Sequence, residues 1–145
     1  MCGAVRFTAR NVPSEYGACH CEQCRRWAGS ALLAVTVATD DIVVEGGDNI
    51  ARIQSSAWAE RAWCGKCGSG LWYRVTAEGP LYGNTEIPVG LLDDTTGMSL
   101  VSEIFHDVRC QGFDLANDTR KMTRAEVFAK YAPGLPQEGE NDDQN

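Results

Sequence analysis

The sequence predicts a mainly β domain with one short C-terminal helix. Two observations support this fold class. Short runs rich in β-branched and aromatic residues recur over residues 2–110 and are separated by turn-forming residues, whereas helical spacing of apolar residues is clear only shortly before Pro133. The 145 residues suit one domain with its own core. We therefore expect a single β domain over residues 1–134.

The expected strands follow one another along the chain. Residues 2–9 (CGAVRFTA) alternate apolar and polar side chains, and residues 31–38 (ALLAVTVA) form a continuous apolar run. Residues 41–56 indicate a β-hairpin around Gly46 and Gly47. The remaining extended segments are residues 59–64 (AERAWC), 69–75 (SGLWYRV) and 86–94 (EIPVGLLDD).

The expected helix begins near Thr123. The run T-R-A-E places Glu126 three residues after Thr123, which is the spacing of a capping box. Apolar residues then follow at helical spacing, and the Pro-Gly pair at residues 133–134 ends the helix. The apolar residues are Val127, Phe128 and Tyr131.

Charge and composition limit the classes of partner. The chain has 13 Lys and Arg against 20 Asp and Glu, a formal net charge of -7, which disfavours nucleic acid because its binding depends on neutralising phosphates. The segment at residues 135–145 is acidic and almost free of apolar residues, so we expect a disordered tail. No apolar run reaches the roughly 18 residues of a membrane span, and no secretory signal is recognisable. We expect a cytoplasmic protein with no membrane partner; the sequence leaves a homo-oligomer open.

Seven cysteines carry the strongest chemical signal. Their number is odd and no secretory signal accompanies them, so a disulfide framework is disfavoured. The C-x-C and C-x-x-C spacings instead suit thiolate ligands of one tetrahedral ion. The cysteines are Cys2, Cys19, Cys21, Cys24, Cys64, Cys67 and Cys110.

Two groupings of these ligands are open. Cys64 and Cys67 form a rubredoxin-like turn that needs further ligands, with Cys2 as one candidate, and the cysteines of residues 19–24 would then form a three-thiolate zinc site with an open position. An open position is typical of catalytic zinc. The rival is one four-cysteine site drawn from both clusters.

An open three-thiolate zinc favours sulfur chemistry. Three thiolates and Zn²⁺ carry a formal charge of -1, so a bound water would be acidified less than on zinc held by histidines. A substrate thiol suits the borderline-soft ion and would be held as a thiolate at neutral pH. This chemistry predicts a reaction at a carbon attached to sulfur.

Three ordered motifs carry a family resemblance over about residues 2–110. They are C-G-A-V-R-F, C-H-C-x-x-C-R-R-x-x-G and C-G-x-C-G-S-G-L. Together they resemble the glutathione-dependent formaldehyde-activating enzyme family, also called the centromere-protein-V-like family. The resemblance implies an Mss-four-like zinc-binding β-sheet fold with a structural zinc on four cysteines and a catalytic zinc on three. Carried over to this sequence, it assigns Cys2, Cys64 and Cys67 to the structural zinc, and Cys19, Cys21 and Cys24 to the catalytic zinc.

One motif departs from the family pattern. The family strand begins C-x-C-G, which would place its first cysteine one residue before Met1. The structural site therefore lacks a fourth cysteine in this chain. Three explanations are open: the natural start lies upstream, or water or the terminal amine completes the site, or structural zinc binds weakly or not at all. We favour an upstream start, so that an in-frame cysteine codon would precede Met1.

The resemblance implies a zinc-dependent carbon-sulfur lyase acting on a small thiol adduct. The family reaction joins glutathione and formaldehyde to S-hydroxymethylglutathione, and the implied cofactor is up to two zinc ions. Arg25 and Arg26 follow the ligand segment and could pair with a carboxylate of a glutathione-like substrate. The alternative is a non-catalytic zinc-binding module that binds a protein partner.

Several other residues have less specific expectations. We expect His20 to face away from the metal of its neighbours, because adjacent residues of an extended stretch point to opposite sides. His106 is expected in a partly exposed strand, and Cys110 as a small buried thiol. The tryptophans expected to wall the zinc sites are Trp27, Trp63 and Trp72.

Overall fold

The computed structural model describes residues 1–133, and the tail expected at residues 135–145 lies outside them. The described part is mainly β with two short helices, and the helix near the C-terminus confirms the expected fold class. The strands are β1 (Arg6–Ala9), β2 (Glu15–Cys19), β3 (Leu32–Ala38), β4 (Ile42–Glu45), β5 (Ile50–Ser56), β6 (Ala59–Cys64), β7 (Gly70–Val75), β8 (Asn84–Pro88), β9 (Ser99–Ile104) and β10 (Arg120–Met122). The helices are α1 (Glu22–Ala28) and α2 (Arg124–Tyr131).

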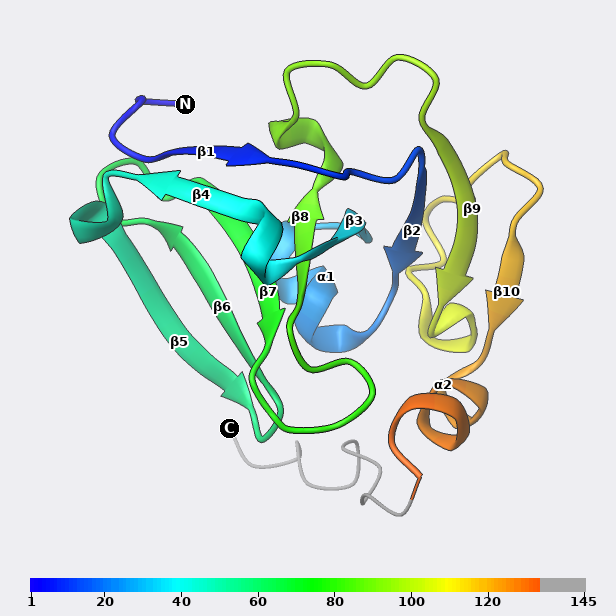
Figure 1. Ribbon diagram of the computed structural model, residues 1–145. Coiled ribbons are helices and arrows are strands. Elements are labelled where there is room, and N and C mark those ends of the chain that lie inside the picture. Colours follow the sequence, from blue (N-terminus) through cyan, green and yellow to red (C-terminus); the bar gives the residue numbers. More distant parts are fainter. Residues whose placement is uncertain (134–145) are drawn as a thin grey trace.

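The strands form one large sheet and one small one (Figure 1). The large sheet has the order β10-β9-β2-β3-β8-β7-β6-β5, and the small sheet pairs β1 with β4. In the large sheet β2 and β10 run parallel to β9, and the other neighbours pair antiparallel. The end of β2 therefore lies inside the sheet, between β9 and β3, where it leads directly into α1.

The central strand β3 is covered on both faces. Val35 and Val37 pack with Ile87 of β8 and with residues of the small sheet, including Phe7. Leu32 and Ala34, which point to the opposite face, pack with Cys24 of α1. Packing on both faces accounts for the apolar residues at these four positions, although Leu33 and Thr36 remain exposed.

The expected hairpin at residues 41–56 is wrong. β4 and β5 are strands, but β4 pairs with β1 and β5 pairs with β6, so they belong to different sheets. Between them Gly46 has φ 74°, and a Cβ at this position would lie 2.0 Å from the carbonyl oxygen of Ala4. The glycine thus redirects the chain against the N-terminal segment and does not close a hairpin.

The helix α2 forms as expected from the sequence. Thr123 is the N-cap, its side chain accepts a hydrogen bond from the Glu126 backbone, and the Glu126 side chain accepts one from the Thr123 backbone. The apolar pair Val127 and Phe128 is buried. No helix within residues 1–133 is long and apolar enough to cross a membrane.

The helix α1 was not expected from the sequence. It has only seven residues, too few for a clear apolar period, but its ends carry recognisable signals. Cys21 serves as the N-cap, since its sulfur accepts the backbone N–H of Cys24, and Gly29 ends the helix with φ 75°. The glycine is suited to this left-handed conformation because it has no Cβ.

Candidate metal centres

Six of the seven cysteines gather into two separate groups. In each group three sulfur atoms lie within 4.8 Å of one another, and within residues 1–133 neither group has a fourth Cys, His, Asp or Glu donor. A four-cysteine site drawn from both clusters is not formed there. We call Cys2, Cys64 and Cys67 the hairpin group, and Cys19, Cys21 and Cys24 the helix group.

The hairpin group sits at the turn between β6 and β7. The turn is tight because Gly68, with φ 76°, donates its N–H to the Cys64 carbonyl at 2.8 Å. Cys2 reaches this turn from the N-terminal segment, and its sulfur lies 3.7 Å from that of Cys64. The pKa of the Cys67 thiol is lowered to about 7, first because the backbone N–H of Ser69 points at its sulfur.

The helix group is assembled where β2 passes into α1. Cys19 ends β2, Cys21 caps the helix, and Cys24 lies in its first turn, where it is 5% exposed. The backbone N–H of Cys24 donates to the Cys21 sulfur at 3.4 Å. A strand end followed by a helix cap thus brings three sulfurs together from a six-residue segment of sequence.

Hydrogen bonds among the three thiols of the helix group shift their pKa values in opposite directions. Hydrogen bonds from the thiols of Cys19 and Cys24 lower the pKa of Cys21. The hydrogen bond with Cys21 raises the pKa of Cys19, and burial adds to this effect. The hydrogen bonds within the group therefore favour ionisation of Cys21 over that of Cys19.

Both groups have a donor set that fits zinc. Two sulfur ligands about 2.3 Å from one tetrahedral zinc ion lie about 3.8 Å apart. The 3.7 Å between the sulfurs of Cys2 and Cys64 matches that spacing, and the helix group is equally compact. Thiolates are ligands that zinc prefers, so three sulfurs at this spacing suit the ion.

A buried arginine contacts the helix group. Arg61 of β6 is 4% exposed, and its Nη2 donates to the sulfur of Cys24 at 3.5 Å. Its guanidinium also lies 5.6 Å from the Trp27 ring and 5.1 Å from the Tyr73 ring. Sequence reasoning missed this residue, because an arginine in a strand is ordinarily exposed and nothing local connects it to a cysteine 37 positions away.

His20 faces away from the helix group, as expected, but it is not at the surface. It is 1% exposed, and its Nε2 donates to Oε2 of Glu103 on β9 at 2.8 Å. Glu103 also accepts from the Thr119 hydroxyl. His106 lies in a short 3₁₀ turn after β9, which corrects the expected strand, and its ring meets that of His20 edge-on at 6.1 Å.

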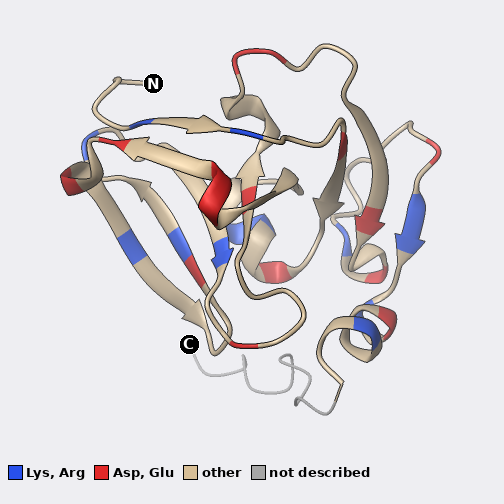
Figure 2. Cartoon of the chain, in the orientation of Figure 1, with Lys and Arg blue, Asp and Glu red and all other residues tan. Residues whose placement is uncertain are grey.

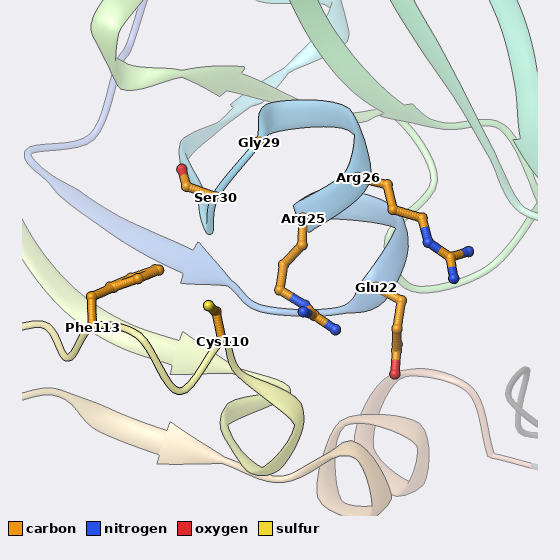
Figure 3. Close-up of a pocket in the computed structure, with 7 residues that line it drawn as sticks. All are labelled: Glu22, Arg25, Arg26, Gly29, Ser30, Cys110 and Phe113. Atoms are coloured by element: carbon orange, nitrogen blue, oxygen red, sulfur yellow. The ribbon is translucent and has the colours of Figure 1, made fainter.

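The two arginines after the ligand segment line a cavity of about 380 Å³ (Figure 3). Arg25 and Arg26 share it with Ser30, Cys110 and Phe113, among others. Arg25 also donates from Nε to the His20 carbonyl at 3.1 Å, which ties it to the ligand segment. Cys110 is exposed, so its expected burial is wrong; it lies in an irregular segment after the 3₁₀ turn.

The tryptophans differ in their relation to the sites. Trp27 of α1 packs on the helix group, and a Cβ at Gly70 of β7 would meet its ring at 3.1 Å. The glycine therefore lets the ring lie close against β7. Trp72 is 1% exposed in the core, and Trp63 is half-buried on β6.

Comparison with known proteins gives three findings. An uncharacterized lyase of Schizosaccharomyces pombe is 28% identical over 129 residues, which cover 88% of this chain and 90% of that protein. A Podospora anserina protein, named as a candidate glutathione-dependent formaldehyde-activating enzyme, is 37% identical over 81 residues, 54% of this chain and 38% of that one. A solved structure of a Rhodobacter sphaeroides protein shares the fold, with a TM-score of 0.54, 23% identity and coverage of 63% of this chain and 83% of that chain.

The family assignment rests on a match between this chain and a family model. The model of the glutathione-dependent formaldehyde-activating enzyme family matches residues 1–108, which include all six cysteines of the two groups. The three sequence motifs that resemble this family fall in the same range. The chain therefore belongs to the glutathione-dependent formaldehyde-activating enzyme family.

Proposed function

We propose that the protein is a zinc-dependent carbon-sulfur lyase that makes or breaks a small thiol adduct of an aldehyde. The observation that carries the proposal is the helix group, whose three sulfurs converge without a fourth donor from residues 1–133. A thiol such as glutathione is the substrate class that suits such a site, and the family name and the name of the Podospora relative agree with it.

The reaction is a balanced addition. A bond forms between the thiol sulfur and the carbonyl carbon, and the thiol proton ends on the carbonyl oxygen, which becomes a hydroxyl. The reverse reaction breaks the same carbon-sulfur bond, and neither direction needs an oxidant or reductant. Zinc held by Cys19, Cys21 and Cys24 would supply the Lewis acidity that lowers the pKa of the substrate thiol.

The chain's own residues would hold and orient the substrate. We assign Arg25 and Arg26 to its carboxylates, because both line the 380 Å³ cavity beside the ligand segment. The guanidinium group is charged at any physiological pH and pairs well with planar anions. The hairpin group would hold a structural zinc that fixes the β6–β7 turn.

The test combines metal content with turnover. Elemental analysis of protein purified without chelators should give about two zinc ions per chain, and Cys24→Ser and Cys64→Ser should each lose a different one. Adduct formation from glutathione and formaldehyde, measured by exchange NMR above the spontaneous rate, should be lost in Cys24→Ser. Cys110→Ser is the matched control for metal content alone: this exposed cysteine belongs to neither group, but it lines the cavity assigned to the substrate.

Two outcomes would overturn the proposal. Unchanged turnover in folded Cys24→Ser would remove the helix group from the reaction. A single zinc ion that is lost in both variants would mean one shared site, and the protein would then be better described as a zinc module that binds a partner.

A further inference from the structure

Arg61 is a buried cation without a carboxylate partner. It is 4% exposed, and no Asp or Glu of residues 1–133 forms an ion pair with it. Its Nε is buried without a hydrogen-bond partner in the same part of the chain. Burying a charge costs several kcal/mol unless an opposite charge compensates it. The guanidinium cannot lose its proton to avoid this cost, so the anion must come from elsewhere.

The neighbours of Arg61 orient it toward the helix group. Nη1 donates to the Gln23 side chain at 3.0 Å and to the Ser55 hydroxyl, and Nη2 donates to the Cys24 sulfur at 3.5 Å. Tyr73, directly opposite on β7, places its ring 5.1 Å from the guanidinium. Of the three side chains that accept hydrogen bonds from the guanidinium, Gln23 and Ser55 are neutral and only Cys24 can become an anion.

The arginine on the adjacent strand provides a comparison (Figure 2 shows basic residues on β5, β6 and β7). Arg74 of β7 also lies over an aromatic ring, 5.0 Å from that of Trp72. It is only partly buried, and its Nη1 lies 3.8 Å from the Glu60 carboxylate. Arg74 therefore has a counter-charge that Arg61 lacks.

We propose that Arg61 is the counter-ion and positioning residue of the three-thiolate metal site at Cys19, Cys21 and Cys24. Three thiolates and Zn²⁺ carry a formal charge of -1, and the guanidinium brings the buried assembly to zero. The hydrogen bond from Arg61 to the Cys24 sulfur also connects β6 to α1, so it fixes the direction in which the Cys24 side chain points. This inference rests on the proposed function, because it assumes a cation at the helix group.

The expected effect is on zinc affinity. Changes in the groups that orient metal ligands typically weaken binding about 10- to 100-fold. We expect a weakening in this range for Arg61→Met, which keeps bulk without charge, and for Arg61→Gln. Arg61→Lys should recover part of the affinity, because it restores the charge without the fork. Arg74→Met should bind zinc as tightly as the unchanged protein.

The measurement is a titration in which the protein competes with a chromophoric chelator for zinc, and two binding phases are expected, one for each group. The phase that is absent in Cys24→Ser belongs to the helix group. The ion at the hairpin group is the internal reference and should be unaffected by every Arg61 variant. Far-UV circular dichroism and thermal unfolding of the metal-free proteins show whether each variant folds. If Arg61→Met does not fold, Arg61→Lys and Arg61→Gln, which keep polar contacts, still test the inference.

The outcomes separate the inference from the proposed function. Affinity unchanged in folded Arg61→Gln, with the phase still absent in Cys24→Ser, would overturn the role of Arg61 and leave the metal site standing. Equal loss in the Lys, Gln and Arg74→Met variants would also overturn it, since charge would then not matter. A wild-type protein whose helix group takes up no zinc would refute both.

Discussion

The buried pair of His20 and Glu103 supports the segment that carries the helix group. Glu103 is 2% exposed and accepts hydrogen bonds from His20 Nε2, at 2.8 Å, and from the Thr119 hydroxyl. Lys121 of β10 approaches the same carboxylate at 3.9 Å. Replacing Glu103 by Gln removes the charge and keeps the size of the side chain, so it tests the electrostatic part alone.

The magnitude follows from the two hydrogen bonds. A hydrogen bond to a charged group contributes about 1.5–3 kcal/mol, against about 0.5–1.5 kcal/mol for a neutral pair. Each bond should therefore weaken by about 1 kcal/mol, and Glu103→Gln should lower the free energy of unfolding by about 2 kcal/mol at pH 7. Urea denaturation followed by tryptophan fluorescence measures this difference directly.

The pH dependence gives an independent check. Burial acts to raise the pKa of Glu103, but the hydrogen bonds from Thr119 and His20 outweigh it and hold the pKa below the usual 4.5. A carboxyl with a lowered folded-state pKa stabilises the fold above its unfolded pKa, and that stability is lost as the pH falls through the folded value. The difference between wild type and Glu103→Gln should therefore be full at pH 7 and shrink below about pH 4.5.

Glu15→Gln is the matched control, because Glu15 lies exposed on β2, the strand that pairs with β9. It should change stability by less than about 0.5 kcal/mol. The reasoning is refuted if Glu103→Gln is no less stable than this control at pH 7. It is equally refuted if the difference persists undiminished at pH 3.

Three further predictions concern the fold. Ile87→Ala should cost about 2–5 kcal/mol in urea unfolding, because the side chain is 1% exposed in the core between β3 and the small sheet. Thr123→Ala should lower the free energy of unfolding by about 1 kcal/mol, because it removes the hydroxyl that caps α2. The other half of the capping box depends on pH: the Thr123 backbone N–H lowers the pKa of Glu126, so the stability from the Glu126 carboxylate is present above its unfolded pKa and is lost on acidification. Gly29→Ala should cost about 1–2 kcal/mol in the same assay, since its φ of 75° strains any residue with a Cβ although the space there is free.

The parts of the fold that could be predicted are those set by local sequence. The burial of β3 on both faces appears as a continuous apolar run, and the α2 cap appears as a capping box. The pairing of β4 with β1 could not be predicted in this way, because Phe7 and Val44 come together across 37 positions and the turn residues between β4 and β5 resemble those of a hairpin. Local patterns identify strands but do not identify their partners.

In the candidate site, too, the features set by local sequence could be predicted and the contacts between distant segments could not. The grouping of the cysteines follows from short spacings, so C-x-C-x-x-C and C-x-x-C already indicate which sulfurs meet. The contacts of Arg61 with Gln23 and Cys24 depend on β6 lying against α1, which only the tertiary structure shows. Cys110 shows the limit of average preferences: free cysteines are often buried, but this one lies exposed in an irregular segment.

The two sulfur groups differ in how far their cysteines are exposed. In the hairpin group Cys2 is exposed, so water can solvate the excess negative charge of a three-thiolate site. Each group has one buried cysteine, Cys64 or Cys24, but the helix group has no fully exposed member, because Cys19 and Cys21 are only partly exposed. If zinc fills the helix group as proposed, the site carries a formal charge of -1, and Arg61 is the buried cation in contact with Cys24 that forms no ion pair within residues 1–133. Under the proposed function, the partial burial of the helix group is therefore the reason to expect an internal cation beside it.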